Sequence, residues 1–203
     1  SSIGYDSNGD TRMTSKLKTD VLETVSGSGT IALTNQLSGM TDASMPSGSV
    51  VQVATVMPNV GDVTLATASW TEPSNLLRIS FTPKYATSTL IIECCFMYGG
   101  GNSSNVNHFK LYDITNSADI ELSGYSNRVG VHGSSRQVDH DLNDCDNMNL
   151  QVVTTASNTT ARTYGMFSRN ESGTVAKYFF ANPTNASELG NAKPILKITE
   201  IKG

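Results

Sequence analysis

The chain has few charged residues. Asp, Glu, Lys and Arg together make up 16% of its 203 residues, and the formal net charge is −4. A protein that binds nucleic acid usually carries a basic patch, because its affinity depends on displacing counterions from phosphates. The low charge and its acidic sign therefore argue against nucleic acid as a partner.

Long apolar runs are also missing. The longest, at residues 90–98, is LIIECCFMY, and it is interrupted by Glu93. A membrane-spanning helix needs about 20 predominantly apolar residues, so this run is too short. The amino end, SSIGYDSNGDTR, is polar and lacks the apolar centre of a secretion signal. We therefore expect neither membrane insertion nor a signal peptide.

The sequence has three cysteines, an odd number, without the spacing of a zinc ribbon or a CxxC redox pair. Cys94 and Cys95 are adjacent in a strand-like run, so their side chains should point to opposite faces. Free cysteine behaves as a small hydrophobic residue. We therefore predict buried free thiols, which suit assembly in a reducing cytoplasm.

Helical periodicity is absent as well. No ten-residue window has the apolar spacing of an amphipathic helix. From Gly48 onward, alternating or continuous apolar segments are separated by turn residues, which is the pattern of short strands. Nine strands are expected, at residues 48–57, 63–70, 76–82, 89–98, 106–113, 149–155, 161–168, 174–181 and 194–201. This pattern predicts an all-β sandwich or barrel of eight to nine strands, with a jelly roll as the leading choice.

The first 46 residues differ from the rest. They contain Gly-Ser segments such as SGSGT and only scattered apolar residues, without a heptad repeat. Such a segment cannot bury enough apolar surface to fold alone. We predict an extended amino-terminal arm at residues 1–46, which becomes ordered on a neighbour, and a jelly-roll β domain at residues 47–203.

Residues 89–98 predict an oligomer. Apart from Glu93, this strand is apolar on both faces, so it should be central in its sheet and covered on both sides. Within one sandwich, only one face of a strand meets the opposing sheet. The other face must then meet another subunit or the arm.

The stretch VDHDLNDCDN, at residues 138–147, is the one candidate for a metal site that the sequence offers. Asp139, Asp141 and Asn143 match the first three ligand positions of an EF-hand calcium loop. The glycine and the glutamate that such a loop also needs are missing from positions six and twelve. A calcium site of another kind is an alternative, but a solvated acidic loop with Asx turns is the favoured interpretation.

No set of side chains predicts catalysis. Glu93 is the only carboxylate inside an apolar run, and a glycosidase would need a second carboxylate facing it. The GxSxG motif is absent, and His108 and His132 are isolated in the sequence. Zinc binding by His140 and Cys145 lacks enough further ligands. We expect no enzymatic activity and no cofactor.

Sugar binding without catalysis is an alternative function. The polar loops expected at residues 99–107, 114–148 and 182–193 offer Asn and Ser side chains that can bond to hydroxyl groups. Aromatic surfaces for stacking would come from Trp70, Tyr98, Tyr112, Tyr125, Tyr164 and Tyr178. The favoured interpretation is that Trp70 and most of these tyrosines are core or interface residues.

Several stretches of the sequence carry motifs that recur in a known protein family. SKLKTDVLETVSGSGTIALTNQ resembles a segment of marine phage virion proteins in which S-x-L-K-x-D-x-L leads into SGSG…LTNQ. PSGSVVQVATV, ISFTPKYATSTLIIECCFMYGGG, NHFKLYD, TARTYGMFSRN and the closing LKITEIKG resemble a β-domain of phage tail-fibre and appendage proteins. Thr89 stands where that family usually has Lys, and the central loops are longer than usual. The shared motifs are structural and not catalytic.

The family is similar to the trimeric jelly rolls of tumour-necrosis-factor type. The resemblance implies a homotrimer that buries the outer faces of its central strands along a threefold axis. It also implies a structural role in a phage virion, as a fibre, knob or decoration assembled in the host cytoplasm. The arm would hold the trimer to other virion proteins. Host cell-surface glycan is a further candidate partner, so a carbohydrate-binding receptor-recognition protein of the tail is the alternative, ahead of a polysaccharide-degrading enzyme.

Overall fold

The computed structural model describes residues 4–5, 11–12, 42–61, 63–99, 106–122, 130–136, 145–171, 177–180 and 193–203. The chain divides into two units, Ser1–Met40 and Thr41–Gly203. In the first unit, the described residues form a pair of short antiparallel strands, β1 (Gly4–Tyr5) and β2 (Thr11–Arg12). The boundary expected after residue 46 falls inside the second unit, and the extended arm stays a prediction.

The unit Thr41–Gly203 contains two antiparallel sheets, and its described residues include a single short 3-10 turn, η1 (Asp42–Ser44). The six-stranded sheet has the order β3 (Val50–Val56), β13 (Ile195–Ile201), β6 (Thr89–Gly99), β12 (Lys177–Phe179), β4 (Val63–Leu65), with β10 (Cys145–Thr155) also paired to β6. The five-stranded sheet has the order β5 (Arg78–Phe81), β11 (Arg162–Asn170), β7 (Val106–Asp113), β8 (Ala118–Asp119), with β9 (Gly133–Arg136) also paired to β7. The predicted all-β class is confirmed.

Each of the nine expected segments overlaps a strand of the structure. The expectation that residues 114–148 form one loop is wrong, because β8 and β9 lie within this segment and β10 begins at Cys145. Strands β8 and β9 consist of Ala-Asp and Gly-Ser-Ser-Arg, so neither carries an apolar alternation. Their conformation comes from backbone pairing with β7, which a local sequence pattern does not reveal.

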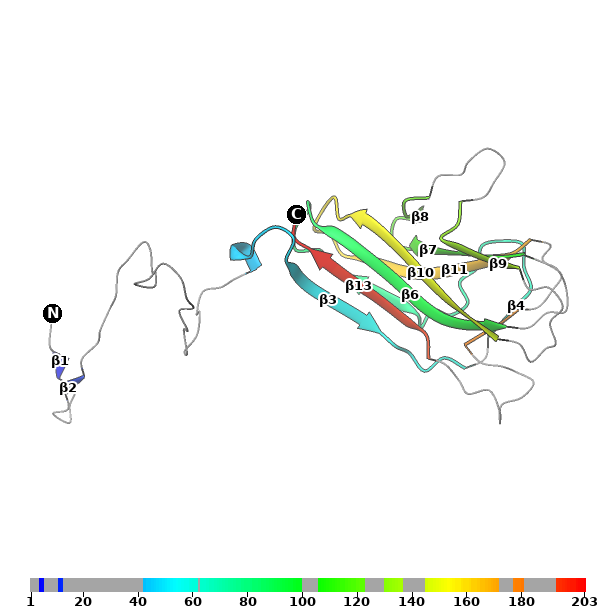
Figure 1. Cartoon of the computed structure of the whole chain (residues 1–203), viewed down its shortest axis with the longest axis horizontal. Helices are drawn as coiled ribbons and strands as arrows, with labels where there is room; N and C mark the ends of the chain where they lie inside the picture. The colour runs from blue at the N-terminus through cyan, green and yellow to red at the C-terminus, as the bar shows by residue number, and fades with distance from the viewer. Residues whose placement is uncertain are drawn as a thin grey trace, which may run out of the picture. The chain divides into compact units, whose positions relative to one another are not determined.

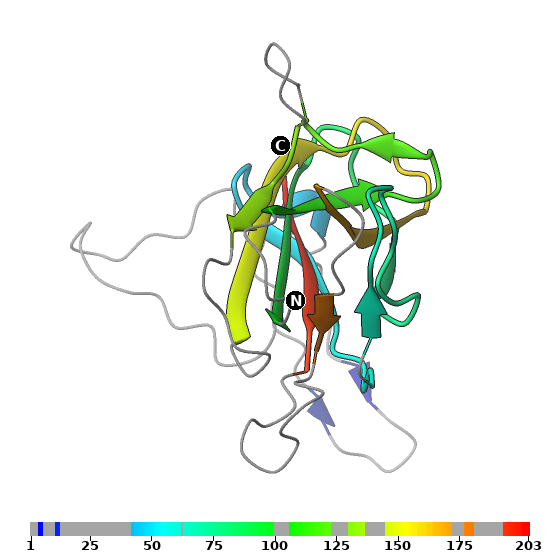
Figure 2. The ribbon, with the colours of Figure 1, turned by 90° about the vertical axis from the view of Figure 1, so that its right-hand side faces the viewer.

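The core lies between the two sheets, which stack face to face (Figure 1; Figure 2). The segment around β5 alternates as predicted, since Leu77, Ile79 and Phe81 are buried. Across the layers, the ring of Phe96 on β6 lies 5.2 Å from that of Phe109 on β7, in an edge-to-face arrangement. Aromatic contacts of this kind add to the burial of apolar area and hold the layers in register.

Strand β6 is central in its sheet. It pairs with β13 on one side and, over its whole length, with β10 on the other. Its inward residues, such as Ile92 and Cys94, are fully buried. Its outward residues are different, because Ile91 is only half-buried and Cys95 is exposed in the single chain. The central position is confirmed, whereas the cover expected over the outer face stays a prediction.

A buried carboxylate fixes the end of β13 to the chain before β6. Glu200 has no exposed surface, and it accepts hydrogen bonds from Gln52 Nε2 at 2.5 Å and from the backbone N–H groups of Lys84 (2.9 Å) and Tyr85 (3.1 Å). Burial alone would raise the pKa of Glu200, but the nearby Ser88 hydroxyl and these hydrogen bonds outweigh it and lower the pKa. The ionised form is therefore the one that the fold stabilises.

We expect Glu200→Ala to lower the free energy of unfolding by about 1–3 kcal/mol, because it leaves buried N–H groups without an acceptor. Urea denaturation at pH 7 measures this loss. Since the pKa is lower in the folded state, the wild-type contribution is present at neutral pH and is lost as the pH falls through the folded pKa. The matched control is Glu171→Ala at an exposed glutamate. Equal losses in the two variants would contradict the role given to Glu200.

Candidate functional site: a pocket between the sheets

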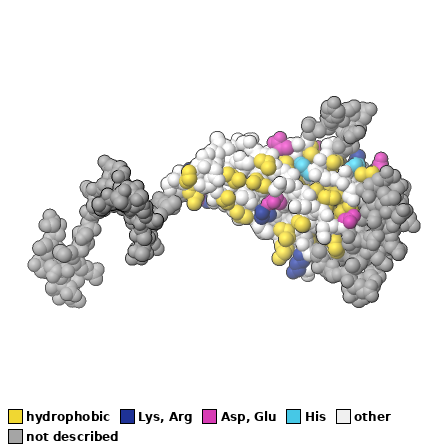
Figure 3. Space-filling model, in the orientation of Figure 1, with side chains coloured by type: hydrophobic (Ala, Val, Ile, Leu, Met, Phe, Trp, Pro, Cys, Tyr) yellow, Lys and Arg dark blue, Asp and Glu magenta, His cyan; other side chains and the backbone are white. Residues whose placement is uncertain are grey.

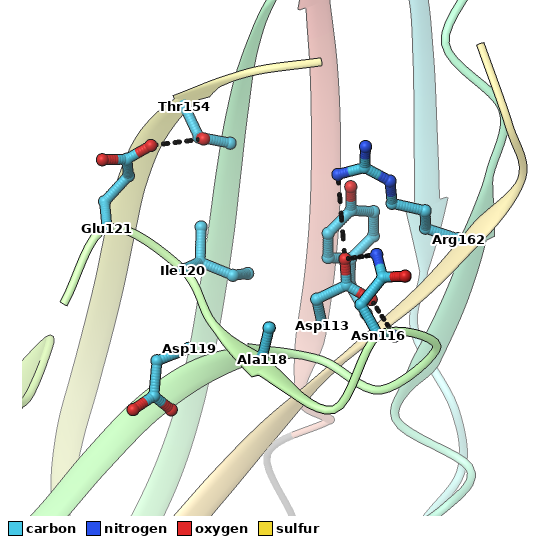
Figure 4. Close-up of a pocket in the computed structure, with 9 residues that line it drawn as sticks. Asp113, Asn116, Ala118, Asp119, Ile120, Glu121, Thr154 and Arg162 are labelled. Carbon is cyan, nitrogen blue, oxygen red and sulfur yellow. Dashed lines mark hydrogen bonds and ion pairs between the residues drawn. The ribbon is translucent and has the colours of Figure 1, made fainter. Parts of the chain in front are cut away.

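A pocket of about 190 Å³ lies at one end of the space between the two sheets (Figure 4). We call it the inter-sheet pocket. Its lining comes from both layers: Asp113, Arg162 and Tyr164 from the five-stranded sheet, Thr154 from β10, and Asn116, Ala118, Asp119, Ile120 and Glu121 from β8 and its flanking turns. The strand ends of both sheets therefore form one concave surface.

Polar residues occupy inward-facing positions around this pocket. Asp113 follows Leu111 on the inner face of β7, and Thr154 follows Val152 on the inner face of β10. Facing sheets normally fill such positions with apolar side chains. The change from apolar to polar residues at the ends of these strands is what makes the pocket hydrophilic.

One wall of the pocket is built around Asp113. Its Oδ1 accepts the Asn116 backbone N–H at 3.0 Å, and its Oδ2 accepts the Asn116 side-chain amide at 2.7 Å. Arg162 Nη1 lies 3.8 Å from the same Oδ2, and Arg162 Nη2 donates to the Ala156 carbonyl at 2.9 Å. Figure 4 shows Asp113, Asn116 and Arg162 gathered on this side. The arrangement positions a carboxylate beside a guanidinium group at the pocket.

Tyr164 contributes a buried hydroxyl group to the same wall. The residue is 2% exposed, and its hydroxyl oxygen is enclosed close to the Arg162 guanidinium group. Burial raises the pKa of Tyr164, and the neighbouring guanidinium group offsets part of this rise.

The opposite wall consists of Glu121 and Thr154. The Thr154 hydroxyl donates to Glu121 Oε1 at 2.7 Å, and Ile120 lies between the two walls (Figure 4). Glu121 has a φ of 47°, in the left-handed region that residues other than glycine rarely adopt. The hydrogen bond to Thr154 ties this residue of one layer to β10 of the other.

The charge of Asp119 is neutralised outside the pocket. Its carboxylate pairs with Lys110 Nζ, and Figure 4 shows it directed away from Asp113 and Glu121. Lys110 is 5% exposed, and its Nζ lies 4.6 Å from the ring centroid of Trp70. The charges left facing the pocket are therefore those of Asp113, Arg162 and Glu121.

His132 supports the pocket from behind. Its Nδ1 accepts the Leu111 backbone N–H at 2.8 Å, and its Nε2 lies 2.9 Å from the Ile120 carbonyl oxygen. This pair of contacts requires the neutral ring with the proton on Nε2. Burial lowers the pKa of His132, which agrees with the neutral form.

We expect the stability of the protein to fall as the pH is lowered from 7 to 5. The unfolded state binds a proton near the ordinary histidine pKa of 6.5, whereas the folded His132 resists protonation, so the folded state loses stability below that pH. Thermal unfolding at several pH values measures the effect. His132→Gln should reduce the dependence of thermal stability on pH. His108→Gln should remove a separate part of this dependence, because burial also lowers the pKa of the half-buried His108. An unchanged slope in His132→Gln would contradict the assignment.

The outer face of the six-stranded sheet is a second candidate surface. Strand register gives three rows of outward side chains: Val53, Thr199, Ile91 and Val153; Thr55, Lys197, Glu93 and Gln151; and Ile195, Cys95 and Asn149. Val53 and Val153 are each 55% exposed. A shallow hollow of about 180 Å³ lies over the second and third rows. Figure 3, in the same view as Figure 1, shows hydrophobic side chains spread over the described surface.

Glu93 lies in the middle row of this face. Its Oε2 is 2.6 Å from Lys197 Nζ, and its Oε1 accepts the Gln151 amide at 3.1 Å. The Glu93 carboxylate is thus paired on the strand face with Lys197 and Gln151. The side chains of the adjacent Cys94 and Cys95 point to opposite faces of the sheet, as predicted. Cys94 is buried and Cys95 is exposed. Cys95 is exposed in the single chain, so its predicted burial depends on the cover expected over the outer face and stays a prediction.

The candidate calcium ligands Asp139, Asp141 and Asn143 lie outside the described residues, as does His140. Cys145 is the first residue of β10. In the part of the chain that the structure describes, no group of three or more His, Cys, Asp or Glu side chains could hold a metal ion. Calcium binding by the acidic stretch therefore stays an alternative for the sequence alone.

The proposed sugar-stacking aromatics are largely engaged in packing. Tyr98 is 1% exposed in the core, and Tyr112 packs on Phe167 with ring centroids 4.7 Å apart. Trp70 packs against Lys110 on the five-stranded sheet, and Arg169 lies 5.5 Å from its ring centroid. Tyr125 lies outside the described residues, and of Tyr178 the structure describes the backbone. Of the set, Tyr164 is the one that lines the inter-sheet pocket.

Sequence reasoning did not single out Asp113, Arg162 or Thr154. The alternation of apolar residues could have indicated that their side chains point inward. Each of them occupies a position in phase with the buried apolar residues of its strand. Their convergence depends on the pairing of strands distant in sequence. No such pairing can be derived from alternation.

The chain matches no protein-family model and no curated protein sequence. Among the described residues, none forms a helix long and apolar enough to cross a membrane.

Proposed function

We propose that this chain is a non-enzymatic structural protein of a tailed-phage virion. Three copies form a trimer of jelly-roll domains, and the amino-terminal arm holds the trimer to other virion proteins as a fibre, knob or decoration. The observation that carries this proposal is the outer face of the six-stranded sheet, where a central strand directs Ile91 and Cys95 away from the core. The place in a virion rests on the phage-protein resemblance of the sequence.

The pairing of strands supports the jelly-roll part of the proposal. The pairs are nested along the chain: β3 with β13, β5 with β11, β6 with β10, and β7 with β8 and β9. A jelly roll has this nesting, because it winds one long antiparallel pair into two facing sheets. Strands β4 and β12 add an extra pair beside β6.

The chemistry of the outer face supports a second copy of the chain as its partner. Val53, Val153 and Ile195 are exposed apolar side chains on this one face. Burying them is favourable by about 25 cal/mol per Å² of apolar surface. Lys197 and Glu93 form an ion pair in the middle row of this face, so that row has no net charge. Two identical faces can therefore approach each other without electrostatic repulsion. A cyclic trimer brings the same face of each subunit to one axis and leaves none open.

The position of Glu93 argues against the glycosidase alternative built on this residue. Glu93 lies on the outer face, whereas Asp113 and Glu121 lie at the inter-sheet pocket on the other side of the sheet. Hydrolysis of a glycosidic bond needs two carboxylates that flank the same bond. Glu93 cannot form such a pair with either pocket acid, because the sheet separates them.

We expect the full chain in solution to have three times the 21.6 kDa mass of one chain, as measured by light scattering with size-exclusion chromatography. Val153→Asp should dissociate it, because burying an unpaired charge costs about 3–5 kcal/mol per site. The matched control is Leu76→Asp, since Leu76 is 56% exposed but lies outside this face. A monomeric wild-type protein at micromolar concentration, or equal dissociation by both variants, would reject the outer face as the interface.

Deletion of residues 1–40 tests the arm. The deletion should stop there because Lys202 Nζ donates to the carbonyls of Ala43 (2.8 Å) and Met45 (2.6 Å), which belong to the sandwich. We expect the truncated protein to keep its trimeric mass and thermal stability but to be lost from purified virions, as measured by protein composition. Normal incorporation of the truncated chain would show that the arm is not the anchor.

A further inference from the structure

We propose that the open edge of β10 pairs with the same edge of a second copy of the chain, so that two six-stranded sheets join into one. The contact uses backbone groups in the plane of the sheet, whereas the trimer uses side chains perpendicular to that plane. It is therefore a second interaction surface, and it does not depend on the trimer. The two strands are antiparallel and related by a twofold axis, so the contact closes on itself.

Strand β10 is an edge strand of the six-stranded sheet. In the part of the chain that the structure describes, it pairs with β6 and with no other strand. The pairing continues from Cys145 to Thr155 without a shift of register. Figure 1 shows β10 beside β6 at the border of the sheet. The long side of β10 that faces away from β6 is thus available for another strand.

The direction of the backbone groups of β10 follows from two hydrogen bonds. Just beyond the strand, Ala156 donates its N–H to the Ser88 carbonyl at 2.9 Å, and these two residues are the next pair in the same register. Hydrogen-bonded pairs alternate along antiparallel strands, so the even-numbered residues of β10 bond to β6. On the other side of β6, Phe180 donates to the Met97 carbonyl, as this alternation requires. The N–H and C=O groups of the odd-numbered residues of β10 therefore point to the open edge.

The other edge strands carry features that prevent pairing with a further strand. On β3, Lys84 Nζ donates to the Val51 carbonyl at 3.3 Å, and the register with β13 shifts between Glu200 and Ile201. Strands β4, β5, β8 and β9 have at most four residues each. Short strands, lysine side chains and register shifts are common ways in which proteins block their sheet edges.

Strand β10 has none of these protective features. Its sequence, CDNMNLQVVTT, has eleven residues, no proline and one charged residue, Asp146. The odd-numbered side chains beside the open edge are exposed and uncharged: Asn147, Asn149, Gln151, Val153 and Thr155. A long, regular and uncharged edge is a template for β-strand addition.

The sequence of β10 is complementary to itself when Gln151 lies on the twofold axis. Asn149 is then opposite Val153 of the second copy, and all paired residues with free backbone groups are odd-numbered, so their N–H and C=O groups meet. On the inner side, the apolar Leu150 and Val152 are opposite each other. The two Asp146 carboxylates lie at opposite ends of the paired segment. These matches favour a second copy of the chain as the occupant of the edge.

The strength of the contact is limited by its size. One pair of strands buries less surface than a standard interface, and each backbone hydrogen bond adds only about 0.5–1.5 kcal/mol net. We therefore expect the edges to pair where copies are held close together in an assembly, because a high local concentration compensates for a weak contact.

Disulfide trapping with Gln151→Cys in the full-length protein tests the proposal. Cys95→Ser and Cys145→Ser are added to remove the thiols of the outer face and of β10. Opposite residues of a hydrogen-bonded pair have Cα atoms about 5.5 Å apart, within the range of about 4.4–6.8 Å that a disulfide spans. Oxidation with copper phenanthroline should give a covalent dimer of twice 21.6 kDa on a non-reducing gel.

Asn149→Cys and Val153→Cys in the same background are the matched controls for register. Each new thiol lies opposite the other position, so it is about 13 Å along the strand from its own counterpart and should give no dimer. A contact through the outer face would place all three positions at the interface. Equal yields of dimer at the three positions would therefore overturn the edge contact, and so would the absence of a dimer from Gln151→Cys.

Asn149→Pro, added to the Gln151→Cys variant, tests the role of the backbone. Proline is tolerated on an edge strand where the N–H faces outward, and it removes one donor from the open edge. It should abolish the dimer, whereas Asn149→Ala, which keeps the N–H, should leave the yield unchanged. Circular dichroism checks that both variants are folded, and equal yields from the two would overturn the proposal. Light scattering under reducing conditions reports on the trimer separately.

Discussion

The packing of the inner face of β6 against β7 is the contact on which the rest of the structure depends. Phe96 and Tyr98 on one layer enclose Phe109 on the other, with ring centroids 5.2 and 4.9 Å apart. Both sheets are organised outward from these two strands, since β6 pairs with β13 and β10 while β7 pairs with β11, β8 and β9. Because the aromatic contact fixes which face of each strand points inward, it also decides which residues face solvent or a neighbour.

A buried charged group completes the edge of this apolar core. Glu200 is bonded by Gln52 and by backbone N–H groups, so its charge is compensated and it acts as a structural link. A buried polar group that is satisfied stabilises the fold, whereas one that is not satisfied carries a cost. The hydrogen bonds around Glu200 therefore stabilise the end of β13.

The alternation of apolar residues was enough to predict the all-β class and the positions of the main strands. It succeeded around β5, where Leu77, Ile79 and Phe81 are in phase, and for β6, whose apolar run predicts a central position. It failed for β8 and β9, because their few polar residues become strands only through pairing with β7. The pocket could not be predicted for a related reason, since Asp113 and Thr154 meet only after distant strands have paired. Local periodicity determines which way a side chain points, but long-range pairing determines what it meets.

Strand β10 serves both surfaces of the protein at once. Its even-numbered residues line the core and the pocket, while its odd-numbered residues, including Gln151 and Val153, form part of the outer face. Inserting or deleting one residue within β10 would exchange the two sets, placing valine side chains among the pocket polar groups and threonine outside. Length variation in homologous chains should therefore be confined to the connections before and after β10, which are free to diverge while the strand itself keeps a constant length.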